Sequence, residues 1–353
     1  MPNMRPLQNS QPFYIRLSHT LLSLVLIVII LRTMKEILAP VAFGFIFAIL
    51  LLPVAQGLER IKFSRALAAT VAVIVFILLL LGLLYFISWQ TTSFLTDLPL
   101  LEKRLMVQAN ELTLWIDQKF QIDSDQQIAW INETAAKSIT TVSAFAMNAV
   151  SSVSSILIFL IFIPMYTFFL LFYRKLLMRF LLKLFHRDHA EEVHEVIAHG
   201  RVVIKSYVVG LFIEMVVVAV LNISALLLLG VKYAVLLGTL GAIFNIIPYL
   251  GMIVTVIITL VVTLTTGTPA LALWAALSLF GIHLVDANIL LPRIVGSKVS
   301  INAMITLLGV FVGSMIWGIA GMFISIPAMA LLKIIFDRIP NMKPWGILMG
   351  SGE

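Results

Sequence analysis

Three ionisable side chains, Glu214, His283 and Asp286, stand inside stretches of the sequence that are otherwise apolar. A charge at the centre of a bilayer costs about 2.5–3.5 kcal/mol on insertion scales, so each of these residues needs a partner or a function. Glu214 lies eight residues into its apolar stretch, roughly 12 Å along a helix axis. Burial favours the neutral form of a carboxyl group, which makes Glu214 a candidate proton carrier. The alternative is a structural ion pair with Lys205 or another basic residue near the inner membrane surface.

His283 and Asp286 are three residues apart, so they share one face of a helix. A His–Asp pair that faces a cavity can bind a cation, relay protons or hold a polar solute. The alternative is that Asp286 only pairs with Arg293 near the helix end. On the functional interpretation, Glu214, Asp286 and His283 are the candidates for ion or proton coupling.

Two segments interrupt apolar helices with a similar order of residue types. Residues 245–251 read NIIPYLG and residues 286–296 read DANILLPRIVG, each with a polar side chain, apolar residues, a proline and a glycine. Lipid cannot satisfy the backbone groups that such breaks expose, so the breaks must face protein or a water-filled cavity. Paired breaks indicate inverted repeats around a transport site. We expect helix breaks at Pro248, Gly251, Pro292 and Gly296.

The polar groups at these breaks predict the kind of molecule that binds there. Asparagine side chains and unwound helix ends offer both donors and acceptors, which suits a small hydroxylated or carbonyl-bearing solute. The residues that we expect to contact the substrate are Asn245, Pro248, Asp286, Asn288 and Arg293.

Four histidines, at positions 186, 189, 194 and 199, are the most tempting metal ligands. A helical zinc site of a metalloprotease places two histidines four residues apart, whereas His189 and His194 are five apart. We therefore read this segment as a solvated helix and expect no metal site. The sequence also has no catalytic Ser-His-Asp grouping and no phosphate-binding glycine loop, so we expect neither an enzyme nor a cofactor.

The composition is that of an integral membrane protein. Hydrophobic residues make up 61% of the chain and charged residues 12%, whereas soluble domains carry about 25% charged residues. There are no cysteines, which excludes disulfides and thiolate chemistry. The net charge of +7 comes from basic residues beside apolar stretches. That pattern indicates membrane orientation and no nucleic-acid partner.

The apolar stretches predict an all-α membrane protein with about eight spans. Basic residues follow the second and fourth spans, whereas residues 97–137 contain seven acidic and four basic residues. Positive loops face the cytoplasm. We therefore expect a protein of the cytoplasmic membrane with both termini on the cytoplasmic side and this acidic segment on the outer side. In this eight-span topology, Arg293 and Lys298 lie on the outer side of the membrane. They could face the cytoplasm if the broken segments are re-entrant hairpins. The predicted spans are 17–31, 37–58, 66–88, 143–173, 206–231, 233–266 as one broken span, 271–291 and 299–332.

The pattern divides the chain into six regions. The acidic segment has apolar residues at helical spacing up to position 120 and a second helix signal from Ser124, which predicts a small external helical hairpin. The predicted regions are the three-span segment 1–96, the external segment 97–142, the fourth span and its basic end 143–187, a cytoplasmic amphipathic helix 188–205, the transport core 206–337 and a cytoplasmic tail 338–353.

Several motifs in the second half resemble the autoinducer-2 exporter family. They are GVKYAVLLG at 230–238, NIIPYLG at 245–251, NILLPRIVG at 288–296 and ISIP at 324–327. The resemblance implies about eight spans, cytoplasmic termini, a pentamer of protomers that work independently, and export of the quorum-sensing signal autoinducer-2. Other members of that family are described as sodium- or lithium-proton antiporters, so the resemblance identifies the fold better than the substrate.

The sequence therefore predicts a secondary transporter in the bilayer that exports a small polar metabolite by alternating access. One alternative is a sodium(lithium)/proton antiporter that uses Glu214 and Asp286. A second alternative is a membrane scaffold that transports nothing.

Overall fold

The computed structural model describes residues 12–120, 153–185, 190–246, 250–294 and 301–350, and every regular element in these ranges is a helix. The elements are α1 (Phe13–Thr33), α2 (Lys35–Arg60), α3 (Arg65–Phe120), α5 (Val153–Phe172), α6 (Arg174–Leu184), α7 (Ala190–Leu228), α8 (Ala234–Phe244), α9 (Leu250–Thr266), α10 (Pro269–Val285), the π-helix η2 (Asp286–Leu290), α11 (Leu291–Ile294), α12 (Ala303–Trp317), α13 (Ile319–Arg338), the 3-10 helix η4 (Pro340–Met342) and α14 (Lys343–Met349).

The chain is an all-α, multi-pass membrane protein, as predicted. In the described ranges, five stretches of helix are long and apolar enough to cross a membrane, and α5 with α6 adds a sixth if this pair, bent by 69°, counts as one span. Helices α8, α9 and α12 and the apolar part of α1 are shorter than a full span. The count of eight therefore stays a prediction.

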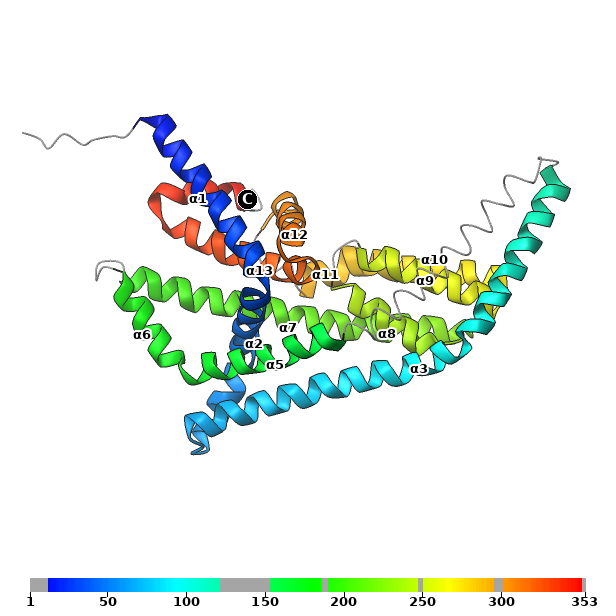
Figure 1. Cartoon of the computed structure of the whole chain (residues 1–353), viewed down its shortest axis with the longest axis horizontal. Coiled ribbons are helices and arrows are strands. Elements are labelled where there is room, and N and C mark those ends of the chain that lie inside the picture. The colour runs from blue at the N-terminus through cyan, green and yellow to red at the C-terminus, as the bar shows by residue number, and fades with distance from the viewer. Residues whose placement is uncertain (1–11, 121–152, 186–189, 247–249, 295–300, 351–353) are drawn as a thin grey trace, which may run out of the picture.

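Helix α7 is the element along which the other segments are arranged (Figure 1). Its 39 residues form one continuous helix, so the predicted cytoplasmic helix and the predicted fifth span are not separated. Helices α8 and α10 pack beside its C-terminal half, and α13 packs beside its N-terminal half. Side chains on one helix thus meet two different groups of helices.

Helices α8 and α9 form an antiparallel hairpin. A Cβ at Gly251 would overlap the carbonyl of Phe244, and a Cβ at Gly241 would press on Thr255, so residues at equal distances from the bend face each other. The missing side chains allow the two helices to approach closely. Both outer ends of the hairpin therefore lie on one side, which corrects the prediction that 233–266 is a single broken span and agrees with the re-entrant alternative.

A second antiparallel pair, α12 and α13, is joined directly at Gly318, whose φ is +66°. Gly313 and Gly321 face each other so closely that a Cβ on either would overlap the backbone of the other. The lack of side chains at these two glycines permits close packing between the two arms of the same hairpin.

Helix α3 runs for 56 residues and passes through Pro99 without ending. The helix predicted for 97–120 is present, although it continues the third span. The second arm of the predicted external hairpin lies outside the described residues. Beyond the apolar part of α3, Lys232 Nζ lies 2.7 Å from Asp97 Oδ2, and the Tyr233 hydroxyl donates to the same carboxylate. These bonds join the end of α7 and the start of α8 to α3.

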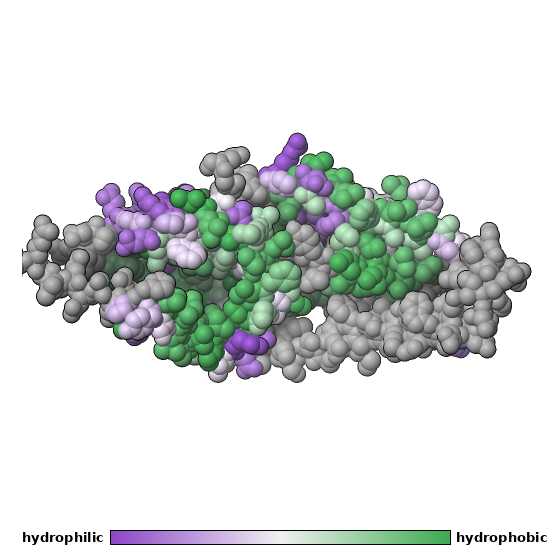
Figure 2. Space-filling model, turned by 90° about the horizontal axis from the view of Figure 1, so that it is seen from above, coloured by the Kyte–Doolittle hydropathy of each residue, from purple (hydrophilic) through white to green (hydrophobic). Residues whose placement is uncertain are grey.

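Much of the surface is apolar. Figure 2 shows hydrophobic side chains over broad areas of one face, with hydrophilic side chains in separate groups. Large side chains such as Leu79, which is 70% exposed, and Leu228, which is 89% exposed, point away from the protein. A surface of this kind suits contact with lipid rather than water.

Candidate functional site

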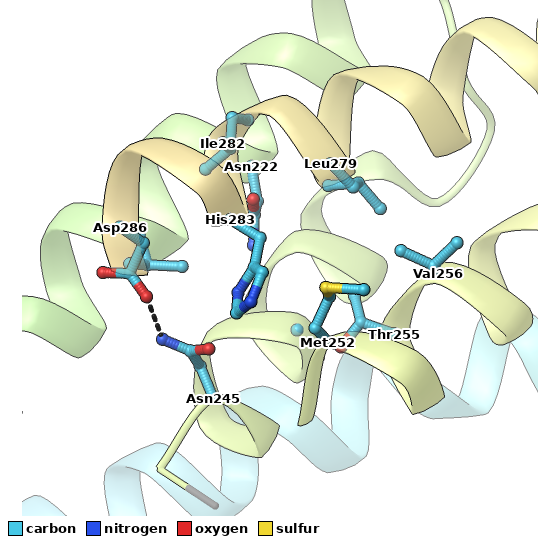
Figure 3. A pocket seen from close by; sticks show the side chains of 11 residues that line it. Asn222, Asn245, Met252, Thr255, Val256, Leu279, Ile282, His283 and Asp286 are labelled. Atoms are coloured by element: carbon cyan, nitrogen blue, oxygen red, sulfur yellow. Dashed lines mark hydrogen bonds between the residues drawn. The ribbon is translucent and has the colours of Figure 1, made fainter. Parts of the chain in front are cut away.

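A small pocket lies where α7, the α8–α9 hairpin and α10 meet. Its volume is about 20 Å³, which is room for about one water molecule, and it is open at its mouth. Figure 3 shows the His283 ring pointing into the pocket, with Asn245 and Asp286 at one edge. The remaining lining side chains are mostly apolar. The lining residues are Val218, Asn222, Gly241, Asn245, Met252, Thr255, Val256, Leu279, Ile282, His283 and Asp286.

One amide connects two buried carboxyl groups at the edge of this pocket. Asn245 Nδ2 lies 2.7 Å from Asp286 Oδ2 and 3.3 Å from Glu214 Oε1. Glu214 and Asp286 are each only 3% exposed. Residues that are 31 and 41 positions from Asn245 in the chain are thus brought to a single side chain.

Each of these three residues is positioned by a different kind of element. Glu214 is held within the continuous helix α7. Asn245 is the C-terminal cap of α8, and its backbone N–H bonds to the carbonyl of Gly241. Asp286 begins the π-helix η2, a widened turn of the type that is frequent at functional sites. The acid pair therefore depends on how the hairpin tip sits against α7 and α10.

The geometry limits the charge that the pair can carry. Glu214 Oε2 and Asp286 Oδ1 are buried and have no hydrogen-bond partner among the described residues. Two carboxylates that share one amide donor repel each other when both are ionised, and a low-dielectric interior strengthens this repulsion. The arrangement is therefore suited to hold a proton or a monovalent cation. In the described part of the chain, no three His, Asp or Glu side chains are grouped to hold a metal ion.

The structure brings some of the predicted site residues together and leaves others apart. Asn245, His283 and Asp286 line the pocket, and Glu214 contacts its edge through Asn245. Asn288 is exposed and donates to the backbone carbonyl of Leu284 in its own helix. The exposed Arg293 and Pro292 also lie outside the lining. Pro248 and Gly296 lie outside the described residues, and Gly251 stands at the tight hairpin contact.

The sequence reasoning missed two polar residues of the pocket, Asn222 and Thr255. They are 5% and 7% exposed. Glu214, Val218 and Asn222 are spaced by four residues and lie on one face of α7, so helical periodicity from Glu214 would have indicated Asn222. Thr255 gives a weaker signal, because many threonines occur in apolar helices.

A buried polar pocket between broken apolar helices is the arrangement of a membrane transporter. The chain matches the family described as AI-2E family transporter over residues 21–341, and it belongs to that family. It is 24% identical over 346 residues to a candidate transport protein of Haemophilus influenzae, covering 96% of this chain and 98% of that protein. It is 23% identical to the Escherichia coli AI-2 transport protein TqsA, covering 93% of each.

A second Escherichia coli relative, YhhT, is 23% identical over 345 residues and is matched over 95% of both chains. The protein is therefore a membrane transporter with a small-molecule substrate. The family is one of transport proteins, in agreement with the expectation that the chain is not an enzyme.

Proposed function

We propose that this protein is a secondary transporter of the cytoplasmic membrane that exports a small polar metabolite by alternating access. Autoinducer-2 is the first substrate to test, since the relative TqsA is named an AI-2 transport protein. The observation that carries the proposal is the acid pair of Glu214 and Asp286, joined by Asn245 at the edge of a polar pocket.

The pair supplies a way to couple protons to movement. With a proton bound, the two carboxyl groups share Asn245 and hold the tip of the α8–α9 hairpin against α7 and α10. When the proton leaves, the two negative charges repel each other, and the contact that closes the site is weakened. Proton binding from one side and release to the other would then alternate the side to which the pocket opens.

The expected orientation and assembly are part of the same proposal. Basic side chains gather on α6, and Arg338 at the end of α13 contacts Glu195 near the start of α7. These features support a cytoplasmic location for this end of the molecule, with both termini inside. Assembly as a homo-oligomer, and as a pentamer in particular, rests on family resemblance.

A sodium(lithium)/proton antiporter is the second candidate. The specific observation that favours it is that Glu214 Oε2 and Asp286 Oδ1 have no partner among the described residues. Carboxylate and amide oxygens are ligands for hard cations, so one cation in place of one proton would satisfy the same groups.

The test uses purified protein in liposomes that contain a pH-sensitive dye, with sodium, lithium and potassium gradients and then with labelled autoinducer-2. The variants are Glu214→Gln and Asp286→Asn, with Asn288→Ala as a control outside the pocket. Proton movement that depends on autoinducer-2 and is lost in both carboxyl variants supports the exporter. Proton movement that depends only on the cations supports the antiporter, and no flux of either kind contradicts both.

A further inference from the structure

A second polar cluster in the pocket has no assigned role. Asn222 is 5% exposed and lines the pocket from α7. Its side-chain amide makes no hydrogen bond to another described residue and is not among the fully buried atoms without a partner, so it is reached from the pocket. Polar groups in this position are satisfied by water or by a ligand. An amide offers both donors and an acceptor.

The backbone of Gly241 lies close to this amide. A Cβ built on Gly241 would lie 2.6 Å from Thr255 Cγ2, 3.1 Å from Asn222 Nδ2 and 3.4 Å from Thr255 Oγ1, so the three residues are packed against one another. The amide of α7 and the hydroxyl of α9 therefore converge above a residue that has no side chain. Thr255 Oγ1 donates its hydrogen to the carbonyl of Gly251, 2.7 Å away, which leaves the hydroxyl oxygen free to accept.

The cluster of Asn222, Gly241 and Thr255 is separate from the acid pair. Asn222 follows Glu214 by eight residues on one helix, which is about 12 Å along the axis. The apolar Val218 lies between them on the same face, and Leu279 and Ile282 of α10 line the pocket opposite α7. Neutral polar groups at one end and apolar walls around them suit a small uncharged molecule, whereas an ion would prefer the carboxyl groups.

We propose that Asn222, Gly241 and Thr255 form the solute subsite of this transporter and that the acid pair is a distinct proton site. The subsite takes a small uncharged molecule that carries hydroxyl or carbonyl oxygens. Its oxygens accept from the Asn222 amide, one of its hydroxyl groups donates to Thr255 Oγ1, and its carbon face packs on the apolar wall. This inference rests on the proposed function and adds the residues that recognise the solute.

The test exploits the lack of cysteine in the natural sequence. Val218→Cys places one thiol of similar size on the pocket wall, and Val220→Cys places one on the exposed side of α7. Each variant in liposomes is labelled with a small water-borne thiol reagent. The probes are autoinducer-2, the neutral five-carbon polyol xylitol, and lactate as a charged molecule of similar size.

We expect autoinducer-2 or xylitol to slow labelling of the Val218→Cys variant several-fold, and lactate to leave it unchanged. Adding Asn222→Leu to Val218→Cys should raise the solute concentration for half-protection by about tenfold, because one hydrogen bond is lost. Ser224→Leu, an exposed polar-to-apolar change on α7, is the matched control and should not change it. Gly241→Ala, whose methyl group would overlap Thr255 Cγ2 and crowd Asn222, should weaken protection as Asn222→Leu does.

Equal protection of the Val218→Cys and Val220→Cys variants, no protection by either neutral solute, or no labelling of the Val218→Cys variant would overturn the subsite. Transport of the labelled solutes is measured in parallel on the wild-type protein. Transport without protection contradicts the subsite alone. Protection without transport contradicts the proposed function and supports the subsite.

Discussion

Asn245 Nδ2 lies 2.7 Å from Asp286 Oδ2, although the first residue ends α8 and the second begins the widened turn after α10. This bond connects the tip of one hairpin to the break in another helix. The two helix breaks with a similar order of residue types, at 245–251 and 286–296, are therefore in direct contact through this bond.

Replacement of Asn245 by alanine should reduce transport by at least about tenfold. The change removes the donor that Glu214 and Asp286 share, and leaving buried charged groups without a partner costs about 1–3 kcal/mol or more. The measurement is solute flux in liposomes. Asn288→Ala is the control, since Asn288 bonds only within its own helix, and we expect less than about a twofold change. Equal losses in the two variants would contradict the assignment of the site.

Gly251→Ala should lower the melting temperature of the protein in detergent. The new methyl group would overlap the carbonyl of Phe244 at the tightest point of the α8–α9 hairpin. Overpacking of this kind typically costs about 1–3 kcal/mol. Gly281→Ala on α10 is the matched control, because no atom lies within 4 Å of the added methyl group. An unchanged melting temperature for Gly251→Ala would show that the hairpin is less tightly closed.

The ion pair of Asp97 and Lys232, beyond the membrane-spanning part of α3 (Arg65–Thr92), predicts a dependence on pH. The hydrogen bond from the Lys232 ammonium lowers the pKa of the Asp97 carboxyl. Because the folded-state pKa is below the unfolded one, the pair stabilises the fold above the ordinary pKa of about 4 and loses this effect as the pH falls through the folded-state pKa. Asp97→Asn should therefore lower the melting temperature at pH 7 and at low salt, and less so at pH 3.

The control for this prediction is Lys232→Gln, which removes the same pair from the other side. The double variant should be no less stable than Asp97→Asn, since both single variants lose the pair with Lys232. Lys232→Gln leaves the hydrogen bond from the Tyr233 hydroxyl to Asp97 in place. Additive losses, or a loss that persists unchanged at pH 3 and at high salt, would show that the ion pair is not the cause.

Trp317→Phe should loosen α1. The indole Nε1 of Trp317 donates to the carbonyl of Leu31, 2.8 Å away, and joins the end of α12 to the end of α1. Most side chains of α1 are exposed, so few other contacts replace this bond. Hydrogen exchange of the α1 amides should accelerate in this variant and stay unchanged in Trp274→Phe, whose side chain is 61% exposed. Unchanged exchange in Trp317→Phe would show that lipid or neighbouring protein holds α1.

Much of the helical fold could be predicted from the sequence, because long apolar stretches in lipid must satisfy their backbone groups internally. Whether residues 233–266 form one broken span or a hairpin could not be predicted from the sequence. A crossing helix with a kink and a hairpin both place Pro248 and Gly251 at a break, and only the contact of Gly251 with Phe244 distinguishes them. Helix α3 continues through Pro99, where the sequence pattern suggested separate elements.

The site could be predicted in part for a similar reason. Glu214, Asn245 and Asp286 are polar exceptions in apolar stretches, and all three meet in the structure. Arg293 follows Asp286 by seven residues, a spacing that shares a face in a regular α-helix. The π-helix between them changes the register, and Arg293 is exposed outside the pocket. Hydrogen-bond patterns that widen one turn leave little trace in residue types.

The widened turn at Asp286–Leu290 also has a mechanical meaning. A π-helical turn accommodates one residue more than an α-helical turn does. If the turn tightened to regular α-helix, the segment after it would rotate by about 100° around the axis and advance by about 1.5 Å. Helix α10 would keep its packing while α11 rotated about the helix axis and moved along it. One turn of helix can thus convert a small change at Asp286 into rotation of the chain that follows.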